Sequence, residues 1–348
     1  MGAKTAIGLD IGTSAVRAAE VQVKGGGVRL LRFGQVGLPP GAVVDGQVVD
    51  DVAVTAALKA LWKGAKLKGT KVMLGVANQH VSVRQATLPW MPPDEFAASL
   101  RFQAADLVPI PIDSAVVDFV PVRETQSDNE RLYSGLLVVA SQDVILDAIA
   151  VAKAAGLSVV GVDLSAFAVM RAVVRPEAVA GQPEAIVDIG ARVTHVVIHQ
   201  DGVPLFVRVL LTGGLDVTRA LCESLNIDMA AAELLKRSAG HDLSANGDAA
   251  RAALAAAMAR LVEEVRGSLD YYQASTPGPH VGRIVLSGGA SQAHGLALML
   301  SQHHQIPVVA ARPFATLDTT PTGLSPVQIA FAESSAAVPV GLALGGVR

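Results

Sequence analysis

The sequence predicts an α/β protein built from two duplicated halves, and three observations support this prediction. First, Ala6–Val21 and Ala185–His199 follow one plan: a β-rich run ends in Asp-Ile-Gly, a polar turn follows, and a second β-rich run returns. Second, a third apolar run follows each pair, at Val28–Val36 and at Pro204–Leu211. Third, these runs are nearly continuous in Val, Ile and Leu, as is typical of strands that are covered on both faces.

The first half is predicted to open with a hairpin over Lys4–Val23, followed by the strand Val28–Val36. Apolar residues at helical spacing predict a helix over Asp50–Lys68, with Asp51 as its N-cap. Lys71–Ala77 is then expected to be a short buried strand.

A separate α+β unit is expected between the two halves, starting near Val81, where prolines begin to punctuate the chain. Its predicted elements are a helix opened by Asp94 and ended by Pro109–Pro111, the strands Val116–Val122 and Gly135–Ala140, a surface loop at Glu124–Arg131, and a helix over Asp143–Ala155.

After the second Asp-Ile-Gly unit, helical spacing of apolar residues predicts a mostly helical segment. The predicted elements are helices over Leu215–Leu225, Met229–Ser238 and about Asp248–Gln273, a strand over Arg283–Ser287, and a helix from the Gly288-Gly289 turn through Leu300. The tail after Pro313 shows little regular signal until Ala330–Leu344.

Composition excludes several classes of protein. Apolar residues make up 51% of the chain, so intrinsic disorder is excluded for most of its length. There are 28 Lys and Arg residues against 31 Asp and Glu residues, a net charge of −3 that argues against a nucleic-acid partner. The single cysteine, Cys222, rules out a disulfide framework and fits a reducing compartment.

High apolar content also raises the possibility of a membrane protein, but no segment has the roughly 20 consecutive apolar residues that a membrane-spanning helix needs. The longest uncharged stretch, Ile284–Ala311, contains many Ser, Gln and His residues that a bilayer core would not accept cheaply. The start of the chain reaches Asp10 too soon to be a signal peptide. The chain is therefore expected to be cytoplasmic, with no direct membrane insertion.

The two Asp-Ile-Gly turns are candidate phosphate sites. Gly12 allows close approach to a ligand, its neighbours Thr13 and Ser14 add hydroxyl donors, and backbone N–H groups in such a turn can bind an anion. Asp10 and Asp188, at the ends of the two first strands, are placed to hold Mg²⁺ through water. One such turn alone is as compatible with an ordinary tight turn, but two in duplicated halves can grip a triphosphate from both sides.

Two further features are candidates for contacts with a nucleoside. Gly288 and Gly289 connect a strand to a helix without side chains, so the backbone there can press against a purine or a ribose. Glu233 and Lys236 are three residues apart on one helix face. Taken singly, the glycine pair is equally well a plain connector, and the charged pair is by default interpreted as a solvated ion pair.

The order of these motifs along the chain resembles the actin-like ATPase superfamily, which includes actin, sugar kinases, Hsp70-type chaperones and FtsA. Within it the chain is most similar to the PilM family of the type IV pilus machinery. The residues that support this are Leu88-Pro89-x-Met91-Pro92, Phe96-x-x-x-Leu100-x-x-Gln103-Ala104, Val108-Pro109-Ile110-Pro111-Ile112, Val139-Ala140, Gly161-Val162-Asp163 with Phe167-Ala168, Leu269-Asp270-Tyr271-Tyr272 and Gly341-Leu342-Ala343-Leu344.

The resemblance implies an actin-like ATPase fold: two duplicated RNase H-like halves around a nucleotide cleft, with an inserted subdomain 1C of the FtsA and PilM type. The implied subdomains are 1A over residues 1–80 and 161–184, 1C over 81–160, 2A over 185–214 and 281–348 with a C-terminal return helix, and 2B over 215–280.

The resemblance also implies ATP and Mg²⁺ as cofactors and assigns roles to residues that match the family motifs. The residues implied to bind ATP are Gly12, Thr13, Ser14 and Arg17 in the first phosphate turn, Gly190, Ala191 and Thr194 in the second, Gly213 and Gly214 at the hinge side, Glu233 and Lys236 at the nucleoside, and Gly288, Gly289 and Ala290 at the adenosine. Asp10, Asp188 and Ser165 are the implied catalytic positions, and the two aspartates are the implied Mg²⁺ sites.

Two departures from the family pattern concern hydrolysis. Arg192 lies in the second phosphate turn, where relatives more often have small or hydroxyl residues, and it either contacts a phosphate or points outward. Ser165 replaces a Glu that would position the attacking water, and a hydroxyl is a poor base. At most a slow ATPase is therefore expected.

The expected partners are the N-terminal cytoplasmic tail of a PilN-like membrane protein and other pilus assembly proteins, with self-association left open. The tail would dock in a nucleotide-sensitive groove and recruit the chain to the inner face of the cytoplasmic membrane. The alternatives are a small-molecule kinase of the same superfamily, an FtsA-like division filament, and a docking module whose nucleotide site is dead. No second cluster of polar residues is evident for a kinase substrate, and no basic amphipathic helix of the FtsA type is evident at Gly345–Arg348.

Overall fold

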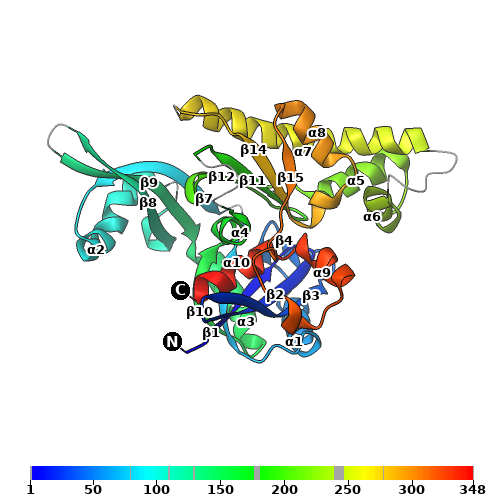
Figure 1. Cartoon of the computed structure of the whole chain (residues 1–348), viewed down its shortest axis with the longest axis horizontal. Coiled ribbons are helices and arrows are strands. Elements are labelled where there is room, and N and C mark those ends of the chain that lie inside the picture. The colour runs from blue at the N-terminus through cyan, green and yellow to red at the C-terminus, as the bar shows by residue number, and fades with distance from the viewer. Residues whose placement is uncertain are drawn as a thin grey trace.

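Two five-stranded sheets repeat one plan in the two halves of the chain (Figure 1). In each sheet three sequential strands pair antiparallel, and two more strands continue the sheet in parallel beyond the first of them. The first sheet has the order β3 (Gly27–Gly37), β2 (Ala15–Lys24), β1 (Lys4–Ile11), β6 (Lys71–Val76) and β10 (Ser158–Leu164). The second has the order β13 (Val203–Leu210), β12 (Thr194–Gln200), β11 (Glu184–Ile189), β14 (Arg283–Ser287) and β15 (Val308–Ala310). The predicted duplication is confirmed.

The computed structural model describes most of the chain. The described residues are 2–78, 80–108, 110–127, 130–175, 181–238, 247–276 and 278–347. The predicted helix end at Pro109 and part of the predicted loop at Glu124–Arg131 lie outside these ranges.

Two helices cover one face of the first sheet. Helix α1 (Asp51–Gly64) is capped by Asp50 rather than by Asp51, because the Asp50 carboxylate accepts the Ala53 N–H at 2.9 Å. Helix α3 (Gln142–Ala154) packs beside α1, and its buried Val151 and Ala152 share a core with the first sheet. This packing differs from the prediction, which grouped α3 with the inserted unit. A short hairpin of β4 (Val43–Val44) and β5 (Gln47–Val48) precedes α1.

The inserted unit is a three-stranded antiparallel sheet with its own core. The order is β7 (Val81–Pro89), β9 (Glu130–Ser141) and β8 (Ala115–Ser127), with α2 (Pro93–Ala104) packed against it. The short turns η1 (Ala105–Leu107) and η2 (Ile112–Ser114) connect α2 to β8. The prediction of a loop over Glu124–Arg131 was wrong for most of its length: β8 and β9 remain paired out to Ser127 and Glu130. An ion pair between Arg131 and Glu124, at 2.6 Å, joins these polar strand ends.

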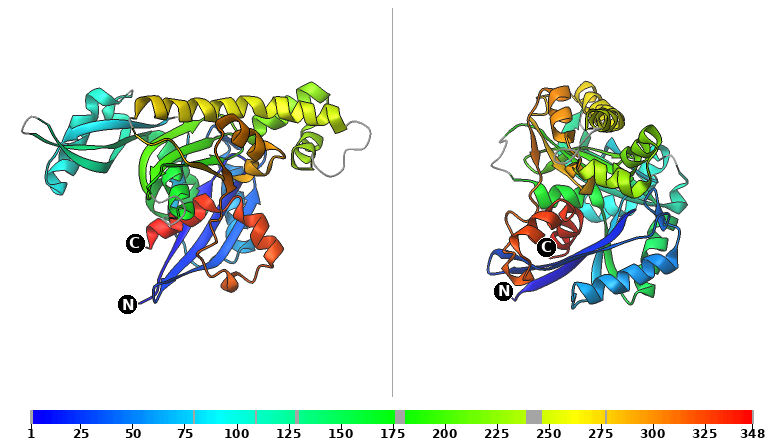
Figure 2. Two further views of the ribbon diagram at one scale, coloured as in Figure 1. Left: turned by 45° about the horizontal axis from the view of Figure 1, so that its top comes forward. Right: turned by 90° about the vertical axis from the view of Figure 1, so that its right-hand side faces the viewer.

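The second sheet is covered by helices that continue its core. They are α5 (Gly214–Leu225), α6 (Met229–Ser238), α7 (Gly247–Ser275) and α8 (Leu296–His304). Figure 2 shows the long α7 crossing the outer side of this sheet. The helix predicted to run from Gly288-Gly289 through Leu300 is instead the short turn η3 (Gly289–Gln292) followed by α8, because Gly295, with φ of 80°, interrupts the helical path.

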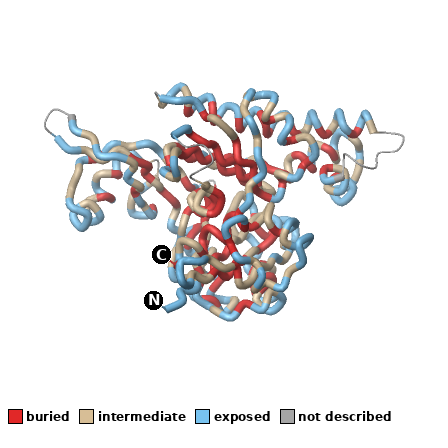
Figure 3. Tube along the Cα trace, viewed as in Figure 1, coloured by how far each residue is buried: buried red, intermediate tan, exposed pale blue. Residues whose placement is uncertain are grey.

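Two helices lie between the sheets and join the halves. Helix α4 (Ser165–Val173), which the sequence patterns did not predict, packs on α10 (Ala337–Gly346). A side chain at Gly341 would place its Cβ 1.7 Å from the Ala168 carbonyl oxygen, so only glycine permits this approach. Figure 3 shows buried residues concentrated in the second sheet and in this central layer.

The C-terminal tail returns to the first half through η4 (Thr320–Thr322) and α9 (Pro326–Glu333). The region with predicted regular structure, Ala330–Leu344, is thus divided between α9 and α10. No single helix within the described ranges is long and apolar enough to cross a membrane, although α9 and α10, bent by 88°, meet the length and composition test as a pair.

Candidate functional site

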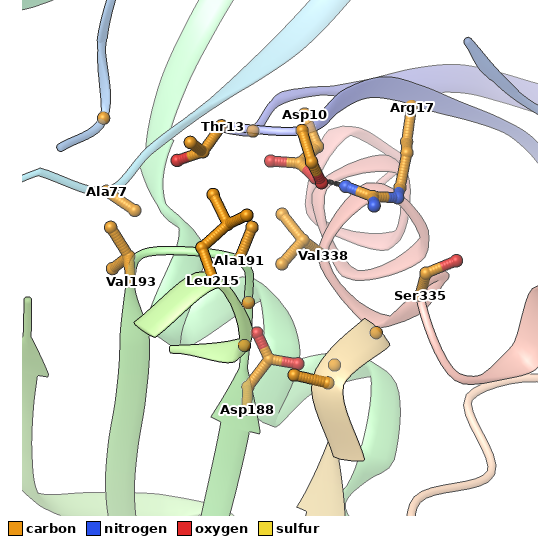
Figure 4. Close-up of a pocket in the computed structure, with 18 of the residues that line it drawn as sticks. Asp10, Thr13, Arg17, Ala77, Asp188, Ala191, Val193, Leu215, Ser335 and Val338 are labelled. Carbon is orange, nitrogen blue, oxygen red and sulfur yellow. Dashed lines mark hydrogen bonds and ion pairs between the residues drawn. The ribbon is translucent and has the colours of Figure 1, made fainter. Parts of the chain in front are cut away.

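The first Asp-Ile-Gly turn connects β1 and β2 and opens toward the second half. The Gly12 N–H donates to the Ala15 carbonyl at 3.1 Å, which closes a tight turn around Thr13 and Ser14. A Cβ at Gly12 would lie 3.2 Å from both the Ala15 oxygen and Arg17 Nη1, so the turn has little spare room. Figure 4 shows the Thr13 side chain beside the cavity between the halves.

The second Asp-Ile-Gly turn connects β11 and β12 and closes in the same way. Its Gly190 N–H donates to the Val193 carbonyl at 2.9 Å. The start of α5 then packs on this turn, because the Gly214 N–H donates to the Gly190 carbonyl at 2.9 Å and the Leu215 N–H to the Ala191 carbonyl at 2.8 Å. The second turn therefore receives two backbone hydrogen bonds from the start of α5, whereas the first receives one from outside its hairpin, from the Leu38 N–H to the Ser14 carbonyl at 2.9 Å.

Asp10 and Asp188 lie on opposite walls of one cavity (Figure 4). Each pairs across its hairpin with a residue seven positions later: Arg17 Nη1 lies 3.5 Å from Asp10 Oδ2, and His195 Nδ1 lies 3.4 Å from Asp188 Oδ2. Burial raises the pKa of Asp10 above its usual value; Arg17 opposes this rise, and the negative charge of Asp188 adds to it. One buried and one part-buried carboxylate that repel each other favour a bound cation.

The glycine turn after β14 forms another part of the wall. Gly288 has φ of 90°, and a Cβ there would lie 2.3 Å from the Ile189 carbonyl oxygen, so the position requires glycine. At Gly289 a Cβ would meet nothing within 4 Å. The turn thus offers a backbone surface with open space in front of it.

Helices α5 and α6 supply a buried lysine. Lys236 is 6% exposed, and its Nζ donates to the Gly214 carbonyl at 3.0 Å, Thr218 Oγ1 at 2.9 Å and Glu233 Oε2 at 2.6 Å. Burial lowers the pKa of Lys236, which outweighs the opposite effect of Glu233. For Glu233 burial acts to raise the pKa, but hydrogen bonds from Lys236, Thr218 and Arg237 outweigh it and the pKa is lowered. The pair is therefore not the solvated surface pair that spacing alone would suggest.

These elements enclose a cavity of about 560 Å³, a size that is usual for small-molecule sites. Most of the predicted site residues line it. They are Asp10, Gly12, Thr13, Ser14, Arg17, Ser165, Asp188, Gly190, Ala191, Gly214, Glu233, Lys236, Gly288, Gly289 and Ala290.

Two predicted residues lie behind the wall. The Thr194 hydroxyl is fully buried and donates to the Thr212 carbonyl at 2.7 Å. The Gly213 N–H donates to Asp216 Oδ2 at 2.9 Å, and a Cβ at Gly213 would lie 2.6 Å from the Gly190 oxygen. Both residues support the second turn from outside the cavity.

Several lining residues were missed from the sequence. They include Gly46, Gly75, Ala77, Val193, His195, Leu215, Thr218, Met229, Arg237, Ser335 and Val338. His195 had a usable signal, because aligning the two repeats places it opposite Arg17, seven residues after the aspartate in each case. Some of the others, such as Val193, Leu215 and Arg237, are sequence neighbours of predicted site residues, whereas Gly46, Gly75, Ala77, Ser335 and Val338 come from segments in which no site residue was predicted.

The two departures from the family pattern have different surroundings. Ser165 begins α4 and is 2% exposed, beside Gly75, where a Cβ would lie 2.8 Å from the serine Oγ. Arg192 pairs with two carboxylates: Asp45, at 2.9 Å from Nη2, and Asp216. It is therefore neither free in solvent nor among the residues that line the cavity.

Comparison with known proteins agrees with this geometry. The family model described as "Type IV pilus assembly protein PilM" matches residues 8–347. Among curated proteins, the cell division protein FtsA of Bacillus subtilis (strain 168) is 23% identical over 257 residues, which are 68% of this chain and 58% of FtsA. The chain thus spans less than two thirds of the length of that relative.

Solved structures show the same fold. The PilM–PilN type IV pilus biogenesis complex matches with a TM-score of 0.86 and 28% identity, covering 99% of this chain and 98% of that one. Two further structures share the actin-like architecture. The ethanolamine utilization protein EutJ of Carboxydothermus hydrogenoformans matches with a TM-score of 0.57 and 16% identity, covering 99% of this chain and 90% of that one. ADP-bound MreB5 of Spiroplasma citri matches with a TM-score of 0.51 and 15% identity, covering 97% of this chain and 94% of that one. The chain therefore has an actin-like ATPase fold and belongs to the PilM family of type IV pilus assembly proteins.

Proposed function

We propose that this member of the PilM family binds ATP with Mg²⁺ and, in a nucleotide-sensitive manner, docks the cytoplasmic tail of a PilN-like membrane protein. The observation that supports nucleotide binding best is the meeting of three turns on one cavity. The two aspartate-bearing turns and the Gly288-Gly289 turn reach it from separate parts of the chain.

The residues present fit a triphosphate. The Thr13 and Ser14 hydroxyls are available as donors in the first turn. Arg17 Nε and His195 Nε2 are buried and have no hydrogen-bond partner, so a phosphate oxygen would satisfy groups that are otherwise costly to bury. The bare backbone at Gly289 leaves room for a flat base or a ribose.

Asp10 and Asp188 also fit a hydrated Mg²⁺. Arg17 and His195 each contact Oδ2 of their aspartate, which leaves Oδ1 of both carboxylates for a cation or its waters. Within the described ranges, no group of three or more His, Cys, Asp and Glu side chains is arranged as a metal site. The ion would therefore rely on water and phosphate oxygens, which is usual for Mg²⁺. When bound, it would neutralise charge on the phosphates.

Hydrolysis is proposed to be slow. Ser165 lines the cavity and can hold a water molecule, but its hydroxyl is a poor general base. ATP would then serve mainly to hold the two halves in one arrangement. In this proposal the bound nucleotide sets the shape of a groove between the inserted unit and the first half.

The proposed partner follows from the relative with the same overall fold. That relative was solved as a PilM–PilN complex, and its similarity extends over 99% of this chain. A PilN-like tail bound to this chain would recruit it to the inner face of the cytoplasmic membrane.

Calorimetry tests the nucleotide site first. Wild-type protein is expected to bind ATP with Mg²⁺, and Asp188→Asn to weaken that binding by about 10- to 100-fold, because a charged ligand for the hydrated ion is lost. Asp270→Asn, which changes an exposed carboxylate on α7, is the matched control and should bind as wild type. Failure of wild type to bind ATP with Mg²⁺ would contradict the proposal.

A synthetic PilN tail then tests the docking function. The peptide is expected to bind wild type more tightly with ATP and Mg²⁺ than without them. Equal binding under both conditions would remove nucleotide sensitivity from the proposed function but leave docking intact.

A further inference from the structure

An ion pair joins the two halves of the molecule beside the cavity. Arg192, in the β11–β12 turn of the second half, donates to Asp45 Oδ1 from Nε at 3.1 Å and from Nη2 at 2.9 Å. Asp45 lies between β4 and β5 in the first half, 147 positions away. The two side chains are only 21% and 24% exposed, so water competes weakly for the contact.

Arg192 is held in place by its own half. Its Nη1 donates to Asp216 Oδ1, and Asp216 lies in the first turn of α5. Asp216 Oδ2 in turn accepts the Gly213 N–H at 2.9 Å. The guanidinium is thus positioned before any contact with the first half, which lowers the entropy lost when it pairs with Asp45.

Asp45 is equally fixed. It has φ of 48° and is followed by Gly46 with φ of 83°, which makes a tight turn between β4 and β5. A Cβ at Gly46 would lie 2.0 Å from the Ala77 carbonyl oxygen, so the turn is pressed against the segment after β6. The Arg192 and Asp45 side chains therefore meet from two turns that are each held in place by contacts within their own half.

The ion pair lies at one rim of the cavity. Residues next to it in sequence, Gly46, Ala191 and Val193, all line the cavity. Figure 4 shows Ala77 and Val193 on one side of the cavity and Ser335, just before α10, on the other. Helices α10 and α4 form the packed layer between the sheets, and the ion pair lies away from that layer. Separation of the halves at the ion pair would therefore open the cavity.

We propose that Arg192 and Asp45 form a latch that holds the two halves together at the cavity rim and thereby slows release of nucleotide. Only the second part, the slowed release, rests on the proposed nucleotide binding. For the cavity to open on this side, two charge-assisted hydrogen bonds must break, whereas the Arg192–Asp216 contact stays within one half. Arg192 thus acts between the halves, not as the phosphate ligand that its place in the turn suggests.

Release kinetics test the latch. Protein loaded with a fluorescent ATP analogue and Mg²⁺ is chased with excess ATP in a stopped-flow instrument. Asp45→Asn and Arg192→Gln are each expected to speed release by about 5- to 20-fold, and the double variant by no more than either one, because all three lack the same contact. Arg29→Gln removes another long-range pair, Arg29–Asp318 at 3.0 Å, but not one beside the cavity, and should release at the wild-type rate.

Salt gives a readout that a general loss of structure would not reproduce. Raising the ionic strength should speed release from wild type by a larger factor than from Asp45→Asn, because both proteins share the contacts to the charged nucleotide and only wild type also has the Arg192–Asp45 pair to screen. Single variants that release at the wild-type rate, or a double variant with the product of the two single effects, would overturn the latch.

Hydrogen exchange on ligand-free protein separates the latch from the proposed function. Exchange at residues 43–48 and 190–193 is expected to rise about 5- to 20-fold in either single variant and to stay at the wild-type level in Arg29→Gln. If wild type binds no nucleotide, the proposed function fails, while this comparison still decides the latch. Unchanged exchange at both segments would overturn it.

Discussion

The two Asp-Ile-Gly hairpins share a backbone plan but differ in what surrounds it. In the first, the turn has two hydroxyl residues, and Arg17 faces Asp10. In the second, the turn has no hydroxyl before Thr194, and His195 faces Asp188. The start of α5 hydrogen-bonds to the second turn, and Arg192 ties it to two further carboxylates.

This difference separates two tasks that a symmetrical pair of turns would share. In the proposed function the first turn would supply its hydroxyl donors to the ligand. In the second turn the Gly190 and Ala191 carbonyls accept from α5 and Arg192 pairs with Asp45 and Asp216, so its proposed contribution to a ligand is the Asp188 carboxylate and its backbone. Duplicated halves can thus keep one scaffold while the side chains diverge.

Replacing the glycine in each turn should give the largest contrast. Gly190→Ala is expected to lower the free energy of unfolding by about 2–3 kcal/mol, because its Cβ would lie 2.7 Å from the Val193 carbonyl oxygen in a turn fixed by α5. Gly12→Ala should cost about 1 kcal/mol or less, since its contacts are at 3.2 Å and one is the movable Arg17 side chain. Urea unfolding measures both, and equal losses would contradict the comparison.

Removing hydroxyls from the first turn, or adding one to the second, should change the protein less than the glycine replacements do. The double variant Thr13→Val, Ser14→Ala is expected to bind ATP with Mg²⁺ about 10-fold more weakly, through the loss of two donors. Ala191→Ser should change the affinity by no more than about 2-fold, because that turn is already committed to α5. Calorimetry gives the affinities, with thermal unfolding as the check on folding. A gain in affinity from Ala191→Ser as large as the loss from the double variant would show that the turns are equivalent.

The pH dependence of Asp10 should be the smallest effect. Its pKa is raised in the folded protein, mainly by burial, so the folded state binds the proton more tightly than the unfolded chain does. The ionised carboxylate therefore costs stability at pH 7, and this cost disappears as the pH falls through the folded pKa.

Wild-type stability should accordingly rise relative to Asp10→Asn as the pH is lowered from 7 toward 4. Urea unfolding of both proteins across that range measures the difference, with Asp270→Asn as a control for exposed carboxylates. A difference that moves the opposite way would show that Arg17, not burial, dominates the surroundings of Asp10.

Much of the fold follows from local patterns. The repeat, the strands of both sheets other than β10 and β15, and the helices α1, α5 and α7 were predictable, because apolar period and glycine position act within a few residues of each other. Helix α4 was missed because its nine residues span too few turns to establish a helical period in the sequence. The ends of β8 and β9 were missed because a hairpin with polar, exposed strand ends has the composition of a loop.

The candidate site likewise contains residues that the sequence predicted and residues that only the fold brings to the cavity. The glycines and aspartates of the turns were predicted, and most of them line the cavity. His195 was predictable only by comparing the two repeats. The surroundings of Lys236 were not predictable, because its burial depends on α5 packing over α6.

The sequence by itself determined a duplicated α/β chain with two aspartate-bearing turns and a separate inserted unit, since each of these depends on residues close together in the chain. The tertiary structure alone decided which side chains meet across the cavity. Asp45 and Arg192 are 147 positions apart, and their contact exists only because two sheets and the central α4–α10 layer place two turns side by side. No local pattern encodes such a distance, so the task of Arg192 could be assigned only from the folded molecule.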